Sequence, residues 1–293
     1  MDSKKTKTLA TSSDPSKKPK AGKGQALFTL ASGTPARISS KTADAPKLDV
    51  APPKRPERQP TFSRDGMDQR LASFLDPKSM GLQCFKMLRA KLFTNDLRVR
   101  PRSIMVTSPQ PLDGKTTVAT NLAIAISRGI GEHVILVDCD LRKPSIDRLL
   151  GLKVNIGLRE YLEVGTSVAP YLVKTPVKKL TVLTAGKSTD NPAELLSSEK
   201  MRLLVEELKA RYEDRYVIFD ATPAKFAAET TFLASMMDGV LLVVRSGKTD
   251  KDLILETIEN IGRKKILGVI FNASQENQRH YHYYYRYYEK GRG

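Results

Sequence analysis

SPQPLDGKTT at residues 108–117 joins two apolar segments, IMVT at 104–107 and VATNLAIAI at 118–126. The first segment has the β-branched, apolar character of a buried strand, and the second has the composition of a helix. Strand, glycine-containing loop and helix in this order place backbone N–H groups around a phosphate at the start of the helix. Five positions before Gly114, where a phosphate loop ordinarily has glycine, the chain has Pro109. The stretch predicts phosphate binding, and the use of the phosphate has to be inferred from other motifs.

The composition is that of a folded protein without membrane spans. The chain has 293 residues and 40% apolar content, enough to build a core. No apolar run approaches the roughly 20 residues that span a bilayer, and the basic N-terminus lacks the apolar region of a secretory signal. We therefore expect a cytoplasmic protein. Cys84 and Cys139 form neither a disulfide framework nor a metal site, and both are expected to be small buried residues in a reducing compartment.

The N-terminal region carries much of the positive charge. The formal net charge is +17, and residues 1–60 hold 13 Lys and Arg against 5 Asp and Glu, a surplus of 8. Residues 1–62 show almost no apolar periodicity and are predicted to be a disordered basic region. This region is either a solvated tail or an electrostatic tether to anionic lipid, nucleic acid or acidic polymer. The scattered charges and scarce aromatic residues favour the solvated tail.

The remainder of the chain reads as an α/β domain with a helical segment before it. Leucine and phenylalanine recur at helical spacing within 63–98, which predicts an amphipathic helical segment whose polar row is Gln83, Lys86 and Arg89. Apolar strands are predicted at 104–107, 134–137, 180–184, 216–219, 240–244 and 267–271, with helices between them. Strands that are apolar throughout and alternate with helices indicate a mostly parallel sheet covered on both faces. We therefore predict a P-loop NTPase-like domain at 99–274, between disordered tails.

Polar groups suited to a magnesium–nucleotide site follow three of these strands. The first strand runs into the glycine-lysine-threonine loop, the second ends on Asp138 and Asp140, and the third ends on Asp220. Ligands of parallel sheets bind at the carboxyl ends of the strands, and Mg²⁺ prefers oxygen ligands. A carboxylate there can also accept a proton from an attacking hydroxyl. A single aspartate at a strand end often only caps a helix, but three such ends after a phosphate loop predict a nucleotide site.

Several motifs in order resemble those of the bacterial tyrosine kinases that regulate capsular and exopolysaccharide synthesis. SPQPLDGKT at 108–116 resembles their phosphate loop, which tolerates the absent early glycine. DCDLRKP at 138–144 is similar to their second acidic motif, DxDLRxP, and FDATP at 219–223 stands at their Walker B position. LTAG at 183–186, followed by NPAELL at 191–196, matches a family segment of no obvious chemical role. The resemblance covers roughly residues 80–293.

The resemblance implies an ATP- and Mg²⁺-dependent tyrosine kinase with a role for each matching residue. It implies that Lys115 holds the β- and γ-phosphates and that Asp138 is the catalytic base. It also implies that Asp140 supports the metal site and that Arg142 helps to neutralise phosphate charge. The implied nucleotide-binding residues are Asp113, Gly114, Lys115, Thr116 and Thr117, and the implied Mg²⁺ residues are Thr116, Asp138 and Asp220.

The last segment, 275–293, holds six of the ten tyrosines, Tyr281, Tyr283, Tyr284, Tyr285, Tyr287 and Tyr288. The resemblance implies that they are autophosphorylation acceptors. Interleaved aromatic and basic residues also suit single-stranded nucleic acid, but beside a nucleotide domain the substrate interpretation is favoured, so no nucleic acid partner is expected. The implied partners are other copies of the chain, a membrane activator that recruits it to the inner face of the plasma membrane, and a cognate tyrosine phosphatase.

The chain departs from the family pattern at three places. The subunit-contact motif ExxRxxR is replaced by Gln83, Lys86 and Arg89, so position 83 offers no carboxylate for a Glu–Arg pair between subunits. Thr222 replaces a usual proline, and Glu229 stands where an aspartate is usual. Two other functions remain open. A positioning or partitioning ATPase would generally carry a further lysine early in the loop, which 108–113 lacks, and a nucleotide-sensing scaffold without kinase activity would keep the same carboxylates.

Overall fold

A seven-stranded sheet forms the centre of the computed structural model, which describes residues 67–71, 79–94, 100–210 and 215–274. The strand order is β3-β4-β2-β5-β1-β6-β7, and every neighbouring pair is parallel except β3 with β4. The mostly parallel α/β fold predicted from the sequence is therefore confirmed. The strands are β1 (Ser103–Thr107), β2 (His133–Asp138), β3 (Leu172–Lys174), β4 (Leu180–Leu183), β5 (Arg215–Asp220), β6 (Gly239–Arg245) and β7 (Ile266–Asn272).

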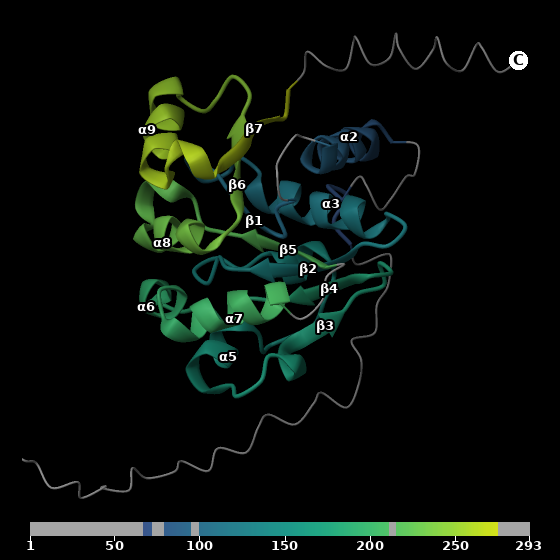
Figure 1. Cartoon of the computed structure of the whole chain (residues 1–293), viewed down its shortest axis with the longest axis vertical. Coiled ribbons are helices and arrows are strands. Elements are labelled where there is room, and N and C mark those ends of the chain that lie inside the picture. Colours follow the sequence, from purple (N-terminus) through teal and green to yellow (C-terminus); the bar gives the residue numbers. More distant parts are fainter. Residues whose placement is uncertain (1–66, 72–78, 95–99, 211–214, 275–293) are drawn as a thin grey trace, which may run out of the picture. The chain divides into compact units, whose positions relative to one another are not determined.

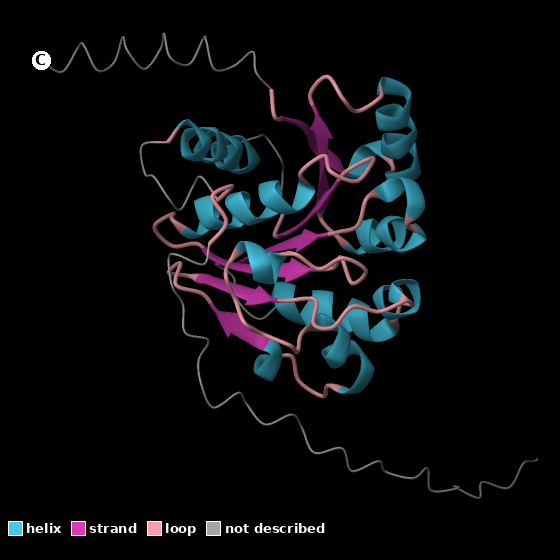
Figure 2. Ribbon diagram, turned by 180° about the vertical axis from the view of Figure 1, so that it is seen from behind, coloured by secondary structure: helices cyan, strands magenta, loops and turns pink. Residues whose placement is uncertain are grey.

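Helices cover both faces of this sheet (Figures 1 and 2). One face carries α2 (Met80–Thr94), α3 (Lys115–Ser127) and the short α4 (Ile146–Leu149). The opposite face carries α5 (Leu158–Val164), α6 (Pro192–Leu196), α7 (Glu199–Ala210), α8 (Ala228–Met236) and α9 (Lys251–Ile261). Single 3-10 turns lie at Ala169–Tyr171, Ala224–Phe226 and Arg263–Lys265. Two separate apolar cores result, one on each side of the sheet.

The predicted strands all occur, and most of their apolar runs are buried on both faces, whereas the edge strand β7 is only partly buried. Every residue of β1 is buried, as are the last five residues of both β2 and β5. The sequence did not predict β3, which has three residues and pairs antiparallel with β4 at the edge of the sheet. None of its residues is fully buried, so it carries no continuous apolar pattern.

The helix expected within 63–98 is α2, and it packs against α3 on one face of the sheet. Leu92 is buried with the residues of α3, and the Phe93 ring stacks on the Tyr216 ring at a centroid distance of 4.7 Å. Arg89 Nη1 donates to Ala125 O at 3.3 Å. Cys139 is buried as expected, but Cys84 is exposed on the outer side of α2, and that expectation was wrong. The tails at 1–62 and 275–293 lie outside the described residues.

Candidate functional site: a phosphate loop with buried carboxylates

The loop between β1 and α3 requires glycine at its last position. Gly114 has φ +94°, in the left-handed region that side chains rarely adopt, and α3 begins at the next residue. A Cβ at this position would lie 2.1 Å from Asn272 Nδ2. Asn272, the last residue of β7, donates from that nitrogen to Asp113 O at 2.8 Å. The glycine therefore allows β7 to approach the loop and leaves the first N–H groups of α3 available to an anion.

The loop is held in place without its usual early glycine. Ala224 N donates to Ser108 O at 2.8 Å and Lys225 N donates to Pro109 O at 3.3 Å, so the segment after β5 supports the start of the loop. Ser108 Oγ donates to Gln110 O at 2.7 Å. Pro109 has no backbone N–H to satisfy, and its carbonyl already has a donor. The structure thus gives a physical reason why proline is tolerated here.

Asp113 lies below the loop, among polar groups from β6 and the turn that follows it. Its Oδ1 accepts from Thr249 Oγ1 at 2.9 Å and from Gln110 Nε2 at 3.3 Å, and the residue is 1% exposed. Arg245 Nη1 donates to Leu112 O at 3.2 Å. Asp113, predicted as a nucleotide-binding residue, is in this structure a brace for the loop and not part of the cavity lining.

Lys115 is a buried cation that meets carboxylates from two strands. Its Nζ donates to Asp140 Oδ2 at 2.9 Å and to Thr116 Oγ1 at 3.1 Å, and it lies 3.6 Å from Asp220 Oδ1. Burial lowers the pKa of Lys115, but the negative charges of Asp220 and Asp140 outweigh burial and raise that pKa above its usual value. Lys115 therefore stays charged at any physiological pH.

Asp138 and Asp220 occupy neighbouring register positions at the carboxyl ends of the parallel strands β2 and β5. Asp138 accepts hydrogen bonds from three backbone N–H groups, those of Asp140 at 3.1 Å and of Ser145 and Ile146 at 3.2 Å. Burial, and then the nearby charge of Asp220, raise the pKa of Asp138 to about 7. A carboxyl group with that pKa exchanges a proton near neutral pH.

Asp220 has weak hydrogen bonding for a buried carboxylate, and its charged partner Lys115 lies 3.6 Å away. It is fully buried, and neither of its carboxyl oxygens has a hydrogen-bond donor in the described part of the chain. Burial raises the pKa of Asp220, and the charge of Lys115 opposes that rise. Two buried acceptor oxygens beside the Thr116 hydroxyl fit Mg²⁺, which takes one or two protein oxygens and completes its shell with water and phosphate. The described residues hold no group of three or more His, Cys, Asp or Glu side chains arranged to bind a metal ion.

A cavity of about 1020 Å³ opens over the loop. Its lining includes six of the predicted residues, namely Gly114, Lys115, Thr116, Thr117, Asp140 and Arg142, whereas the buried Asp138 and Asp220 do not line it. Arg142 is half exposed, and its Nε lies 3.5 Å from Oε1 of the buried Glu229. The six tail tyrosines lie outside the described residues.

Sequence reasoning missed several residues that line the cavity or brace the loop, among them Asp68, Arg70, Arg245 and Asn272. Arg245 and Asn272 end β6 and β7, and their positions at strand ends were a usable signal. Asp68 and Arg70 also line the cavity, but they lie in a short segment before α2 with no recognisable pattern. Glu229, to which no role was assigned, contacts Arg142.

Known proteins resemble this chain in sequence and in fold. The family model of the CobQ/CobB/MinD/ParA nucleotide binding domain matches residues 104–292. The chain is 34% identical over 221 residues to the tyrosine-protein kinase YwqD of Bacillus subtilis (strain 168), covering 75% of this chain and 92% of that one. The crystal structure of the chimerical protein CapA2B2 superposes with a TM-score of 0.65 at 29% identity, covering 74% of this chain and 93% of that one. The kinase domain of the Escherichia coli tyrosine kinase ETK superposes with a TM-score of 0.65 at 25% identity, covering 75% of this chain and 84% of that one.

Proposed function

The chain belongs to the bacterial tyrosine kinases of the capsule type, and from this premise we propose that it is an ATP- and Mg²⁺-dependent autokinase of its own tyrosines at 281–288. The observation that carries the proposal is Lys115, which lies at the start of α3 between carboxylates from two strands. A nucleotide in the cavity would bring its phosphates to this cation and to the N–H groups of the helix.

Each residue of the site has a chemical task in this proposal. Lys115 binds the β- and γ-phosphates, with Gly114 and Thr117 contributing to the loop around them. The Thr116 hydroxyl would bind Mg²⁺, and Asp220 would position the ion through a water molecule, with Asp138 nearby. The ion would neutralise negative charge on the phosphates. Asp140 keeps Lys115 oriented through their 2.9 Å contact, and Arg142 adds positive charge at the mouth of the cavity.

The transfer itself moves one phosphoryl group and one proton. The tyrosine oxygen forms a bond to the γ-phosphorus, while the bond from that phosphorus to the β–γ bridging oxygen breaks and ADP leaves. The phenolic proton passes to Asp138, whose pKa of about 7 suits a proton acceptor. Asp138 and Asp220 are both buried, which keeps this proton away from bulk water.

We propose that the tail of one subunit is phosphorylated by a neighbouring subunit. Each added phosphate carries a charge of about −1.5 to −2 at neutral pH and would turn a mildly basic tail into a strongly acidic one. The phosphorylated tail would then leave the neighbour's site and loosen the assembly. Such a cycle would regulate polysaccharide synthesis or export and would need a tyrosine phosphatase for its reversal.

The proposed place of action is the cytoplasmic face of the plasma membrane. None of the helices in the described ranges has the length and apolar character needed to cross a bilayer. We propose that a separate membrane protein recruits and activates the chain there. Transfer assays should therefore be run with and without the cytoplasmic segments of candidate membrane partners.

One experiment tests the central proposal. Purified protein is incubated with labelled ATP and Mg²⁺, and the wild type is compared with Lys115→Met and with a variant in which all six tail tyrosines are phenylalanine. We expect label on tyrosine that depends on both Lys115 and the tail. A phosphate map without any modification at 281–288 would contradict the proposal. Hydrolysis of ATP without label on the protein would instead favour a positioning ATPase. Nucleotide binding without hydrolysis or label would favour a nucleotide-sensing scaffold.

A further inference from the structure

A second, smaller cavity lies at the edge of the sheet opposite the phosphate loop. Its volume is about 250 Å³, and it is formed where β2, β4 and β5 begin, whereas Asp138 and Asp220 lie where β2 and β5 end. None of the described residues that line it is Asp or Glu. Its permanently charged lining consists of Lys174, Lys178, Lys179 and Arg215. This basic pocket has no task in the proposed nucleotide site.

The turn between β3 and β4 gives the basic pocket a defined shape. Thr175 Oγ1 donates to Leu180 O at 2.9 Å and accepts from Val177 N at 3.2 Å. Val134 N, at the start of β2, donates to Lys179 O at 2.8 Å. Lys179 has φ +66°, a left-handed conformation that a residue with a side chain keeps only where its surroundings hold it. The pocket is therefore built by contacts between the turn and β2.

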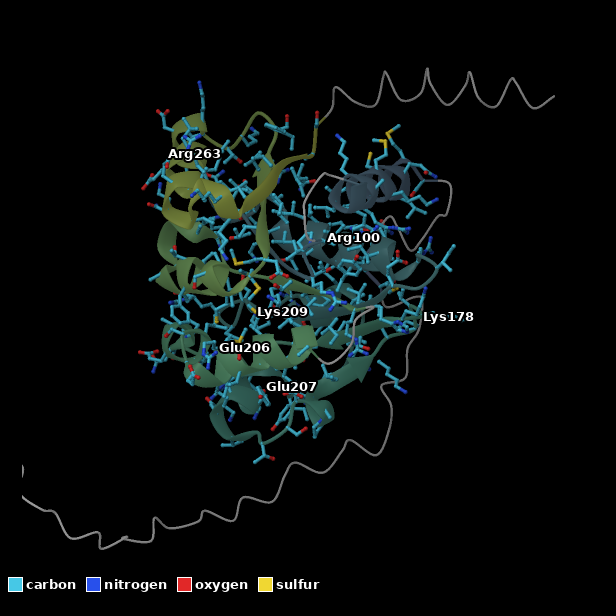
Figure 3. All side chains as sticks on the ribbon, viewed as in Figure 1. Arg100, Lys178, Glu206, Glu207, Lys209 and Arg263 are labelled. Atoms are coloured by element: carbon cyan, nitrogen blue, oxygen red, sulfur yellow. The ribbon has the colours of Figure 1, made fainter. Side chains whose placement is uncertain are left out.

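The lysines of the basic pocket keep their positive charge without neutralisation. Lys179 Nζ donates to the carbonyl oxygens of Gly129 and Ile130, and a carbonyl oxygen carries no net charge to cancel that of the ammonium. Lys174 and Lys178 are exposed, and neither forms an ion pair with a carboxylate of the described residues. Figure 3 shows Lys178 at the margin of the domain. The pocket thus attracts an anion that approaches from outside.

An exposed apolar side chain lies beside these lysines. Ile130, in the turn between α3 and β2, is fully exposed, and its carbonyl oxygen lies 3.1 Å from Lys179 Nζ. Arg128 of the same turn is also exposed. The acidic residue of this turn, Glu132, is directed inward, since its Oε2 is buried and lies against Gly129. The outer surface of the turn is therefore basic and apolar.

Cations around an exposed apolar side chain suit the surface of an anionic membrane. Lysine and arginine attract the negative headgroups, and the apolar side chain enters the boundary between headgroups and acyl chains. We propose that the basic pocket binds the phosphate of an anionic lipid headgroup while Ile130 inserts into the membrane interface. The inference does not depend on phosphoryl transfer, and it adds direct lipid contact to the proposed recruitment by a membrane protein.

Two observations favour lipid over a soluble polyanion such as nucleic acid. Proteins hold single-stranded nucleic acid with cations and with aromatic rings that stack on the bases, but none of the described residues that line the basic pocket is Phe, Tyr or Trp. An exposed isoleucine also gains nothing from a polyanion in water, whereas it gains apolar contact in a membrane. In addition, the cavity over the phosphate loop lies at the other edge of the sheet, so membrane binding leaves it open to ATP.

Co-sedimentation of the full chain with lipid vesicles tests this inference. Vesicles of phosphatidylcholine are compared with vesicles of phosphatidylcholine mixed with phosphatidylglycerol. Lys174→Gln combined with Lys178→Gln should weaken binding to the anionic vesicles about tenfold or more, because each cation close to such a surface contributes about fivefold. Ile130→Gln should weaken binding about threefold or more, because the polar side chain loses its apolar contact with the membrane.

Matched controls remove the same groups from other surfaces. Lys187→Gln combined with Lys251→Gln removes the same charge from exposed positions that follow the carboxyl ends of β4 and β6, and it should leave vesicle binding unchanged. Leu203→Gln, at a half-exposed position of α7, is the control for Ile130→Gln. The basic region at 1–62 is present in every variant, so its own attraction for lipid cancels in the comparison. All variants should keep the affinity of the wild type for an ATP analogue.

Three results would overturn the inference. The two lysine pairs could weaken vesicle binding equally, Ile130→Gln could bind as tightly as the wild type, or anionic vesicles could bind no better than neutral ones. Heparin, a soluble polyanion, is titrated in parallel. Equal losses of heparin and vesicle affinity in the Lys174 and Lys178 variant, with no effect of Ile130→Gln, would assign the pocket to a soluble polymer. A failure of tyrosine labelling would contradict the proposed kinase and leave lipid binding standing.

Discussion

At the scale of single residues, the site combines a buried cation with more negative charge than the cation can neutralise. Lys115 meets Asp140 at 2.9 Å and Asp220 at 3.6 Å, and Asp138 lies on the neighbouring strand. Burial of Asp220 opposes folding, because the ion pair with Lys115 only partly offsets the cost of taking this charge out of water. The site thus holds an unfavourable electrostatic arrangement that a bound metal–nucleotide would relieve.

Asp220→Asn should therefore raise stability and abolish function together. Removing the charge relieves burial and repulsion with Asp138, by about 1–3 kcal/mol, which corresponds to a melting temperature several degrees higher for a domain of this size. The amide cannot serve Mg²⁺ as a carboxylate does, so ATP-dependent tyrosine labelling should fall at least about 100-fold. Calorimetry of the nucleotide-free protein measures the melting temperature, and the labelling assay measures the loss of tyrosine phosphorylation. A lower melting temperature would show that the charge stabilises the fold.

At the scale of elements, contacts with the segment that follows β4 fix where α5 begins. The segment 183–186, which has no obvious chemistry, is the attachment point of α5. Leu158 N donates to Thr184 O at 2.7 Å, and Arg159 N donates to Ala185 O at 3.0 Å. Gly157 lies so close to this segment that a Cβ there would be 2.1 Å from Thr184 O. A structural role therefore explains this motif.

Gly157→Ala should destabilise the fold by about 1–3 kcal/mol, because the methyl group forces the start of α5 away from β4. Urea unfolding of the variant measures the loss. Gly131→Ala is the matched control, since a Cβ at Gly131 meets no atom within 4 Å. The control should be neutral or slightly stabilising. Equal effects of the two variants would contradict the close approach of α5.

Asp238 joins three elements and makes part of the stability pH-dependent. It accepts from Arg102 N and Ser103 N at 2.9 Å each, before β6, and it pairs with Lys209 at the end of α7 (Figure 3). Burial raises the pKa of Asp238, but the hydrogen bonds from Lys209, Ser103 and Arg102 outweigh it and hold the pKa below its usual value near 3.8. A carboxyl group with a lowered pKa stabilises the fold above its unfolded-state pKa and loses that effect as the pH falls through the folded-state pKa.

Asp238→Asn should therefore cost stability at pH 7, by about 1 kcal/mol for this partly exposed group, and this cost should shrink as the pH falls through the lowered folded-state pKa of Asp238. Thermal unfolding of the wild type and of Asp238→Asn, from pH 7 down into acid, measures the difference in stability between them. Glu256→Gln, at an exposed position of α9, should show no such pH-dependent difference. A gap between wild type and Asp238→Asn that persists undiminished in acid would contradict the assignment.

At the scale of the molecule, α2 and the phosphate loop belong to the same packed unit. Leu92 of α2 shares a core with Leu122 and Ile126 of α3, the helix that begins at the loop. The segment 67–71 is attached to α3 and α4 and lines the cavity. The helical segment before the kinase domain is thus connected to the site through one continuous core.

Leu92→Ala should lower the melting temperature of the protein, but α2 should still unfold together with the rest of the domain in a single transition. Loss of a buried leucine side chain from a core costs about 2–3 kcal/mol. Met87→Ala, on the exposed side of the same helix, should cost less than about 0.5 kcal/mol. Far-UV circular dichroism and tyrosine fluorescence should report coincident transitions. Two separate transitions would show that α2 unfolds independently.

Features with a local signature were predictable from sequence. Buried parallel strands are continuous apolar runs, a phosphate loop needs glycine and lysine at fixed spacing, and Asp138, Asp140 and Asp220 directly follow such runs. The strand β3 was not predictable, because a short edge strand buries too little to show a pattern. The exposure of Cys84 depends on which face of α2 meets α3, and composition does not specify that face.

The motifs and their order along the chain were enough to predict the α/β fold, the nucleotide site and the family. Each of these motifs consists of residues that are close together in the sequence. Other features involve residues far apart in sequence, namely the pairing of Arg142 with Glu229 and the support of Pro109 by the segment after β5. Such contacts exist only once the sheet has placed its strand ends side by side. The tertiary packing, and not the local sequence pattern, therefore decides which residues surround the cavity.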